Sequence, residues 1–399
     1  MRNVAALTDA TAADQRMHTP VIVETLRTAI GRRNGSLAGT HAAELIGRVQ
    51  AAALARTGTP PSDVDHVLGG CVTQFGEQSF NVTRTGWLTA GLPWQVPCST
   101  VDCQCGSSQQ ASHLIHCMIA SGSIEVGIAC GVEVMSRVPI GANMVDGSAS
   151  VLPPGFTVDL PNRFVAAERI AQRYGITRDE ADAFGARSQQ RARAAQDSGL
   201  FQRAILPLEV NRSGNDSAMP FLSDECLRPT TVEGLSKLNP LVSAGIHTAG
   251  TVSQIADGAS AILWMEKARA RAAGLSPRAR LLAHALVGTD PSLHINGPVD
   301  VTTHLLKRAG LSIRDIDIFE INEAFASVVL AWHRVFEADF EKLNVDGGSI
   351  ALGHPLGATG GRLIANALDA LERTDGSLAL VAMCCGGAVA TGSIIERLQ

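Results

Sequence analysis

The chain carries one pattern of elements twice, once in each half. In the first half, a helix expected at about 41–56 leads to the short apolar sequence DVDHVL at 63–68. In the second half, a helix at about 301–309 leads to the similar DIDIFE at 315–320. A glycine-rich turn, an amphipathic helix and a further strand follow in both halves, each helix with the apolar periodicity of a buried face. This repetition predicts an α/β protein made of two similar halves.

The distances along the two copies support duplication. Asp65 precedes Ala129, in the strand that closes the first copy, by 64 residues, and Asp317 precedes Ala382 by 65 residues. Alternating helices and strands occur in any α/β protein, but matched offsets favour a repeat. Two such halves, related by a pseudo-two-fold axis, would bring equivalent turns together. We therefore expect residues of both halves to share one site.

A different kind of sequence separates the halves. It contains proline- and glycine-rich loops and a charged helical stretch, and we interpret it as a loop-rich insertion that covers a ligand; simple surface elaboration is the alternative. The expected domains are an extension without fixed structure at 1–19, an N-terminal half at 20–135 and 256–275, a loop domain at 136–255 and a C-terminal half at 276–399.

Composition narrows the function classes. A length of 399 residues suggests two or three domains. The chain has a net charge of −5 and no stripe of basic residues, which argues against a nucleic-acid partner. Neither a bilayer-spanning run nor a signal-peptide core is evident, so we expect a cytoplasmic protein. Nine cysteines, an odd number, favour reduced thiols. Most, including Cys117 and Cys130, are expected to be small core residues.

The two glycine-rich turns each carry one reactive side chain. Cys105, in STVDCQCGS, is expected between a strand and a helix, where the positive helix end would lower a thiol pKa. A structural cysteine is the common alternative. His354, in GGSIALGHPLGATG, is surrounded by glycines and followed by proline, a context poorly explained by core packing. Histidine is the commonest base near neutral pH, so we expect His354 to be catalytic.

Two further positions complete the candidate site. Cys384 ends the last buried strand beside Gly386, whose backbone N–H is suited to stabilising an oxyanion. An inert thiol is the alternative. Asn322, in NEAFA, follows a strand and precedes an apolar helix, where a simple N-cap role would explain it.

No metal site is expected from the sequence. The Cys103-X-Cys105 and Cys384-Cys385 pairs are weak signals, because paired C-x-x-C units and H-E-x-x-H are absent. The fingerprints of dinucleotide-binding and phosphate-binding loops are absent as well.

Taken together, the motifs resemble the thiolase family over nearly the whole chain from about residue 20. They are V-D-x-x-C-G-S, reading VDCQCGS from position 101, then NEAFA, GGSIALGHPLGATG and CCGG in that order. Four stretches are most similar to the steroid 3-ketoacyl-CoA thiolases: TVDCQCGS, GGCVTQFGEQ, GIHTAGTVSQIADGA and CCGGAVATGSIIER. The resemblance implies a five-layered α-β-α-β-α fold from two βαβαβαββ halves plus a loop domain.

The resemblance also implies roles for individual residues. Cys105 would accept the acyl group, His354 would activate it, and Cys384 would be a second acid/base. Asn322, holding a water, would form one oxyanion hole with His354, and the N–H groups of Cys105 and Gly386 would form the other. Contacts with coenzyme A would come from three residues: Arg228, Ser253 and Phe325.

The reaction implied is cleavage of a 3-ketoacyl-CoA by coenzyme A, giving acetyl-CoA or propionyl-CoA and a shortened acyl-CoA. Coenzyme A would be a co-substrate, with no permanently bound cofactor, and the assembly a homodimer or homotetramer. A biosynthetic acetoacetyl-CoA thiolase, a malonyl-dependent condensing enzyme and a non-catalytic CoA- or lipid-binding protein are the alternatives. Ser108 and Ala388 stand where the family commonly has glycine.

Overall fold

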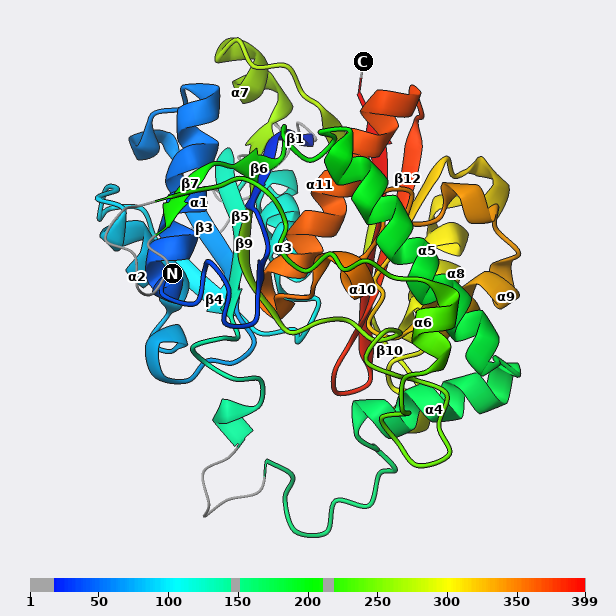
Figure 1. Cartoon of the computed structure of the whole chain (residues 1–399). Helices are drawn as coiled ribbons and strands as arrows, with labels where there is room; N and C mark the ends of the chain where they lie inside the picture. The colour runs from blue at the N-terminus through cyan, green and yellow to red at the C-terminus, as the bar shows by residue number, and fades with distance from the viewer. Residues whose placement is uncertain (1–17, 145–150, 211–218, 399) are drawn as a thin grey trace, which may run out of the picture.

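The structure is a computed structural model that describes residues 18–144, 151–210 and 219–398 (Figure 1). Of the expected extension at 1–19, residues 1–17 lie outside the described part of the chain. Within the described ranges, no helix is both long and apolar enough to cross a membrane.

The N-terminal half is a mixed sheet with helices on both faces. Its strands lie in the order β1-β9-β5-β3-β4. β3 runs parallel to β4 and β5, whereas β9 is antiparallel to both β5 and β1. β5 is buried along its whole length, as expected for a central strand covered on both faces. The elements are β1 (Pro20–Thr28), α1 (Ala42–Thr57), β3 (His66–Gly70), α2 (Val82–Thr89), β4 (Cys98–Val101), α3 (Ser107–Ala120), β5 (Val126–Val134) and β9 (Ala256–Glu266).

The C-terminal half repeats this topology. Its strands lie in the order β10-β13-β12-β11, and an isolated parallel bridge between Phe319 and Leu343 occupies the place that β4 has in the first half. The first and second sheets meet where Ile22 of β1 pairs with Ala279 of β10. The elements are β10 (Ala279–Gly288), α8 (Gly297–Ala309), β11 (Ile318–Ile321), α9 (Ala326–Phe336), α10 (Ser349–Leu352), α11 (Leu356–Thr374), β12 (Leu378–Cys385) and β13 (Val389–Arg397).

One pair of aspartates shows how closely the halves match. The carboxylate of Asp65 accepts hydrogen bonds from the N–H groups of Glu125 and Val126, at 2.8 and 3.0 Å. Asp317 accepts from the equivalent N–H groups at the start of β12, 60 and 61 residues further on, at 2.8 and 3.1 Å. In both halves, one side chain therefore fixes the start of the strand that closes the repeat. The predicted duplication is confirmed.

Three apolar clusters separate the layers. The first packs α1 and α2 on the outer face of the N-terminal sheet. The second contains buried side chains of α3 and α11 together with strands of both halves. The third packs α8 and α9 on the outer face of the C-terminal sheet. The result is the expected α-β-α-β-α order, with α3 and α11 side by side in the middle layer (Figure 1).

The segment between the halves is mostly loops and covers the C-terminal half. Its helix α4 packs on α9, and α5 packs on α10 and α9. A capping box formed by Thr177 and Glu180 starts α5. The remaining elements are β2 (Gly31–Arg32), α4 (Arg163–Tyr174), α5 (Arg178–Asp197), β6 (Ile205–Leu206), β7 (Leu208–Val210), β8 (Met219–Phe221), α6 (Val232–Ser236) and α7 (Lys267–Ala272).

Candidate active site

Cys105 lies in the turn between β4 and α3, as its sequence context predicts. Gly106 is the N-cap of α3, so the free N–H groups of the first helical turn follow the cysteine directly. The backbone N–H groups of Cys105 itself and of Gly386 face the sulfur and lower its pKa. Two donors from opposite halves therefore converge on one thiol.

The pKa of the Cys105 thiol nevertheless rises to about 11. Burial is the main cause, and the positive charge of Arg163 and the two N–H groups offset it only in part. The residue keeps some surface exposure, yet the protein around its sulfur removes enough solvent to disfavour the thiolate. The expectation of a lowered pKa is wrong, because it considered the helix end and ignored desolvation.

His354 lies in the equivalent turn of the second half, between α10 and α11, and is only 4% exposed. Its Nδ1 lies 2.7 Å from the hydroxyl oxygen of Thr359, which itself donates to the carbonyl oxygen of Pro355 at 2.8 Å. Since that hydroxyl proton is already used, this network assigns the imidazole proton to Nδ1. Nε2 is left unprotonated, with a lone pair that can accept a proton, the form that a general base requires.

Asn322 is fully buried beside this lone pair. Its Oδ1 accepts a hydrogen bond of 2.7 Å from Ser349, and its Nδ2 lies 3.5 Å from Nε2 of His354. Arg362 donates to the hydroxyl oxygen of Ser349 at 2.8 Å, which extends the network into the core. The N-cap explanation does not hold, because α9 begins at Ala326, four residues later.

The pKa of His354 falls to about 3. Burial is the largest cause, followed by the positive charges of Arg362 and Arg163. His354 is therefore neutral at physiological pH. Arg163 lowers the pKa of both Cys105 and His354, so one guanidinium on α4 lies near both turns.

Cys384 is the second-last residue of β12 and is 1% exposed. Burial raises the pKa of its thiol well above the ordinary value, and the nearby Cys105 raises it further. The two sulfurs are thus close enough to interact electrostatically. The structure brings Cys105 and Cys384 together although 279 positions separate them, and the turn that carries His354 adjoins the Cys105 turn through the hydrogen bond from Gly361 to Ser108.

Of the three residues expected near coenzyme A, Ser253 and Phe325 lie where the loop segment contacts the start of α9. Val252 forms an antiparallel bridge with Phe325, and the N–H of Ser253 donates to the carbonyl of Ala324 at 3.0 Å. Phe325 is buried, with its ring edge-on to Phe164 at a centroid distance of 5.6 Å. Arg228 is exposed on a nearby loop.

The structure treats the two positions differently: Ser108 gains a hydrogen bond, whereas Ala388 holds a backbone conformation that is strained for alanine. Ser108 is buried, and its hydroxyl oxygen accepts a hydrogen bond of 2.9 Å from the N–H of Gly361, which ties α3 to α11. Ala388 adopts a φ of 62°, in the left-handed region that glycine occupies without strain.

Several functional neighbours escaped the sequence analysis. Thr359 and Ser349 stand within the same glycine-rich motif as His354, and their spacing from it was the available signal. No sequence signal pointed to Arg163 or Arg362, since only tertiary packing brings their charges to the site. Glu133 is similar: it is buried and accepts two N–H bonds from the loop after β3 and one from the first turn of α11, which ties the two halves together beside the site.

Comparison with known proteins gives two family matches. The family model described as "Thiolase, N-terminal domain" matches residues 20–268, and "Thiolase, C-terminal domain" matches residues 275–397. The chain is 41% identical to a steroid 3-ketoacyl-CoA thiolase, FadA6, of Mycobacterium tuberculosis, with 94% of each chain covered. It is 40% identical to a 3-ketoacyl-CoA thiolase of Citrobacter koseri, over 96% of this chain and all of that one.

Solved structures agree with these matches. An acetyl-CoA acetyltransferase of Bacillus anthracis superposes with a TM-score of 0.88 at 32% identity, covering 96% of this chain and 99% of that one. Human mitochondrial 3-ketoacyl-CoA thiolase gives the same TM-score and identity, covering 96% and 100%.

Proposed function

Because this chain belongs to the thiolase family of acyltransferases, we propose that it cleaves a 3-ketoacyl-CoA with coenzyme A through an acyl group carried on Cys105. The observation that carries the proposal is the meeting of the two turns. Cys105 packs on the apolar cluster that contains Leu356, two residues after His354, and the N–H of Gly361 donates to the hydroxyl of Ser108 across the two turns.

In the first half-reaction, the Cys105 sulfur attacks the ketone carbon and its proton passes to Nε2 of His354. The N–H groups of Cys105 and Gly386 stabilise the resulting oxyanion. Collapse breaks the bond between the α and β carbons and expels an acetyl-CoA enolate. His354 and, through a water molecule, Asn322 stabilise the enolate oxygen. Cys384 donates its proton to the enolate carbon and becomes a thiolate.

The second half-reaction uses the same groups in reverse. The Cys384 thiolate takes the proton from the thiol of free coenzyme A, whose sulfur then attacks the acyl carbon on Cys105. The Cys105 sulfur leaves and recovers its proton from His354. Both cysteines end as thiols, so the cycle closes with every proton accounted for. Sulfur suits these transfers because its pKa responds strongly to its surroundings.

Substrate choice follows from the relatives. One of them is named a steroid 3-ketoacyl-CoA thiolase, so a ketoacyl-CoA carrying a steroid-derived side chain is the proposed preferred substrate. Coenzyme A is expected to bind between the loop domain and the C-terminal half, near Arg228, Ser253 and Phe325. The domain limits given above, with the loop domain at 136–255, belong to the same proposal.

The test is a direct assay of thiolysis. Loss of 3-ketoacyl-CoA is followed with and without added coenzyme A for three substrates: acetoacetyl-CoA, a long straight-chain ketoacyl-CoA and a steroid-derived one. The proposal expects coenzyme-A-dependent cleavage, with the highest kcat/KM for the steroid-derived substrate. No cleavage of any of the three would overturn it. Preference for acetoacetyl-CoA would overturn the substrate choice alone.

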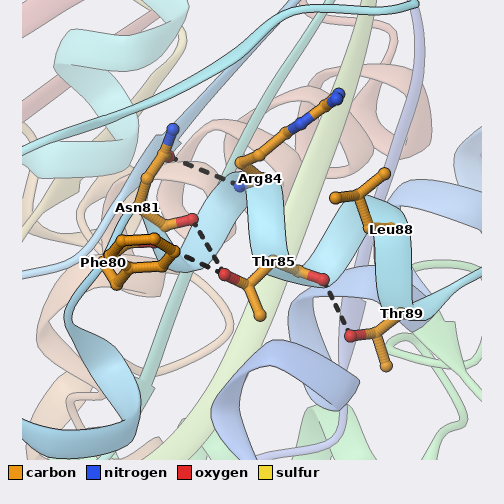
Figure 2. A pocket seen from close by; sticks show the side chains of 6 residues that line it. All are labelled: Phe80, Asn81, Arg84, Thr85, Leu88 and Thr89. Carbon is orange, nitrogen blue, oxygen red and sulfur yellow. Dashed lines mark hydrogen bonds between the residues drawn. The ribbon is translucent and has the colours of Figure 1, made fainter. Parts of the chain in front are cut away.

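A homodimer, alone or paired into a tetramer, is the proposed assembly. β4 is the edge strand of the N-terminal sheet. Near it, on the surface around α2, Phe80 is 93% exposed, and it lines a shallow hollow together with Leu88 and Arg84 (Figure 2). A strand edge beside exposed apolar side chains is a suitable surface for a second copy. Light scattering on the wild type and on Phe80→Asp tests this, with the variant expected to shift toward the monomer; a monomeric wild type would contradict it.

Cytoplasmic localisation remains part of the proposal. Its support is the cysteine content, since all nine cysteines have free thiols in the structure. Reduced thiols are the usual state in the cytosol.

A further inference from the structure

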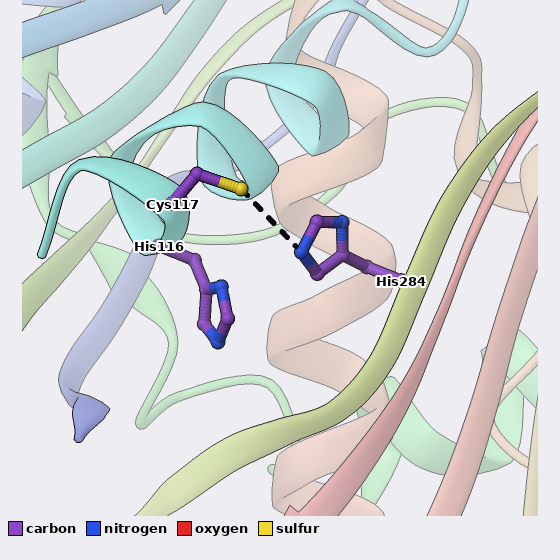
Figure 3. A group of neighbouring side chains, drawn as sticks. All are labelled: His116, Cys117 and His284. Carbon is purple, nitrogen blue, oxygen red and sulfur yellow. Dashed lines mark hydrogen bonds between the residues drawn. The ribbon is translucent and has the colours of Figure 1, made fainter. Parts of the chain in front are cut away.

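A group of metal-binding side chains lies away from the reactive cysteines, between α3 and β10. It consists of His116, Cys117 and His284, whose candidate ligand atoms all lie within 4.8 Å of one another (Figure 3). The Sγ of Cys117 is 3.7 Å from Nε2 of His284. His116 lies nine residues after the start of α3, so the group is roughly 14 Å along the helix from the Cys105 turn.

An irregularity in β10 aims His284 at α3. Side chains alternate between the two faces of a strand. Ala279 and Leu281 point into the middle layer, but the register shifts after Leu281, and Ala283 and Ala285 point into the outer core instead. This shift turns His284 toward the middle layer, where α3 lies. Without it, His284 would face α8 and α9.

The side chains themselves lack other strong partners. Nδ1 of His116 is buried and has no hydrogen-bond partner in the described part of the chain. Cys117, expected from the sequence to be a core residue, is in fact exposed. Its sulfur is therefore reachable from solvent, while His116 and His284 are half-buried behind it.

A neighbouring histidine, His113, orients the His284 ring but is not itself one of the three candidate ligands. Both nitrogens of His113 lie near other partners, Nε2 at 2.8 Å from Ser393 and Nδ1 at 3.3 Å from Gln110. Its ring stacks on His284 with a centroid distance of 4.6 Å, which fixes the orientation of the His284 ring. Arg308, near the His284 carbonyl at 3.5 Å, is the one cation that opposes a metal ion here among the contacts described.

We propose that His116, Cys117 and His284 bind one zinc ion. Two imidazoles and one thiolate form a donor set that zinc favours. With Zn–N near 2.0–2.1 Å and Zn–S near 2.3 Å, tetrahedral ligand atoms lie roughly 3.3–3.6 Å apart. The 3.7 Å between Cys117 and His284 already fits, and His116 closes the remaining distance by side-chain rotation. A water molecule would complete the coordination.

Binding has a defined proton balance. Histidine coordinates zinc through a neutral ring nitrogen and loses no proton on binding. The Cys117 thiol gives its proton to solvent as the Zn–S bond forms. Zinc affinity therefore increases with pH, and one proton is released per ion.

The test measures metal binding directly on the full chain. Metal-free protein is titrated with zinc against a chromophoric chelator, and with cobalt to observe the thiolate-to-cobalt charge-transfer absorption in the near ultraviolet. We expect one zinc per chain and a charge-transfer band. Cys117→Ser should abolish the band, and Cys117→Ser and His284→Gln should each weaken zinc binding by at least about 100-fold.

Two controls separate this site from other thiols and imidazoles. His304→Gln removes an exposed histidine of α8 outside the group and should leave zinc binding unchanged. Cys105→Ala should also leave it unchanged, because the site does not use the reactive cysteine. Equal zinc affinity in wild type, Cys117→Ser and His284→Gln would overturn the proposal. So would loss of binding in Cys105→Ala with retention in Cys117→Ser.

Discussion

The turn before α3 and the turn before α11 occupy the same place in the two halves, yet the first carries a thiol and the second an imidazole. The first exposes part of Cys105 in front of backbone N–H donors. The second buries His354 and holds it through Thr359 at Nδ1, with Asn322 beside Nε2. The frame around both is alike, down to the paired roles of Asp65 and Asp317. Duplication thus sets where two reactive groups meet, and local hydrogen bonds set what each one does.

The two turns share one electrostatic property. Burial raises the pKa of Cys105 to about 11 and lowers that of His354 to about 3. The resting pair is therefore a neutral thiol and a neutral imidazole. On this account, the proton moves during the attack on substrate, and the stabilised oxyanion makes that transfer favourable. This differs from sites in which the cysteine is already a thiolate before the substrate binds.

Removing the nucleophile gives the largest expected effect. In Cys105→Ala, no sulfur remains to receive the acyl group, and thiolysis should fall by at least about 10³-fold. Steady-state assay with a 3-ketoacyl-CoA measures this. Cys103→Ala, which removes a thiol two residues away in the same turn, should retain far more activity. Comparable losses in both variants would mean that the turn, and not the Cys105 sulfur, is needed.

Removing the base comes next. His354→Gln keeps a polar side chain but cannot accept the proton, so kcat should fall by about 10²–10⁴-fold. Single-turnover acylation of Cys105 is the direct measurement. Unchanged acylation in this variant would contradict the division of roles between the two turns.

The same histidine predicts the sign of a pH effect on stability. Its pKa is about 3 in the folded chain and near the ordinary 6.5 when unfolded. The unfolded chain therefore takes up the proton first, and stability that is present above pH 6.5 is lost as pH falls toward 3. Thermal denaturation from pH 8 to 4 should show this loss, and the loss should be smaller in His354→Gln. An equal loss in both would contradict the assigned pKa.

A smaller effect is expected from the residue that orients the base. Thr359→Val removes the acceptor for the Nδ1 proton, a hydrogen bond worth about 1–3 kcal/mol, which corresponds to roughly 5–150-fold in kcat. Thr359→Ser keeps the hydroxyl and should restore most of the rate. If Thr359→Val and Thr359→Ser have the same kcat, the assignment of the imidazole proton to Nδ1 is wrong and Thr359 contributes only packing.

The smallest effect tests the shared frame. Asp65→Ala and Asp317→Ala each remove two hydrogen bonds at the start of a strand, and each should cost about 1 kcal/mol of unfolding free energy. Urea denaturation measures both, and the double variant should show the sum because the sites are distant. A large cost in one half and none in the other would show that the halves are less equivalent than their geometry suggests.

The sequence predicted the duplication and the positions of both turns, because helical periodicity and matched offsets are local signals. The layer order came from the resemblance to the thiolase family. It also selected Cys105, His354, Cys384 and Asn322. It gave the wrong sign for the Cys105 pKa, since desolvation arises from packing between distant segments. The same limit hid Arg163 and Arg362, whose charges reach the site only in the folded chain. The exposure of Cys117, and with it the proposed zinc site, depended on the orientation of α3 that no short pattern encodes.

The most direct test of the account is to trap the acyl group and locate it. The protein is mixed with an acyl-CoA, quenched, and analysed by intact and peptide mass spectrometry. The account predicts one acyl group per chain, attached to Cys105, absent in Cys105→Ala and slow to form in His354→Gln. An adduct on Cys384, or a full adduct in Cys105→Ala, would contradict it.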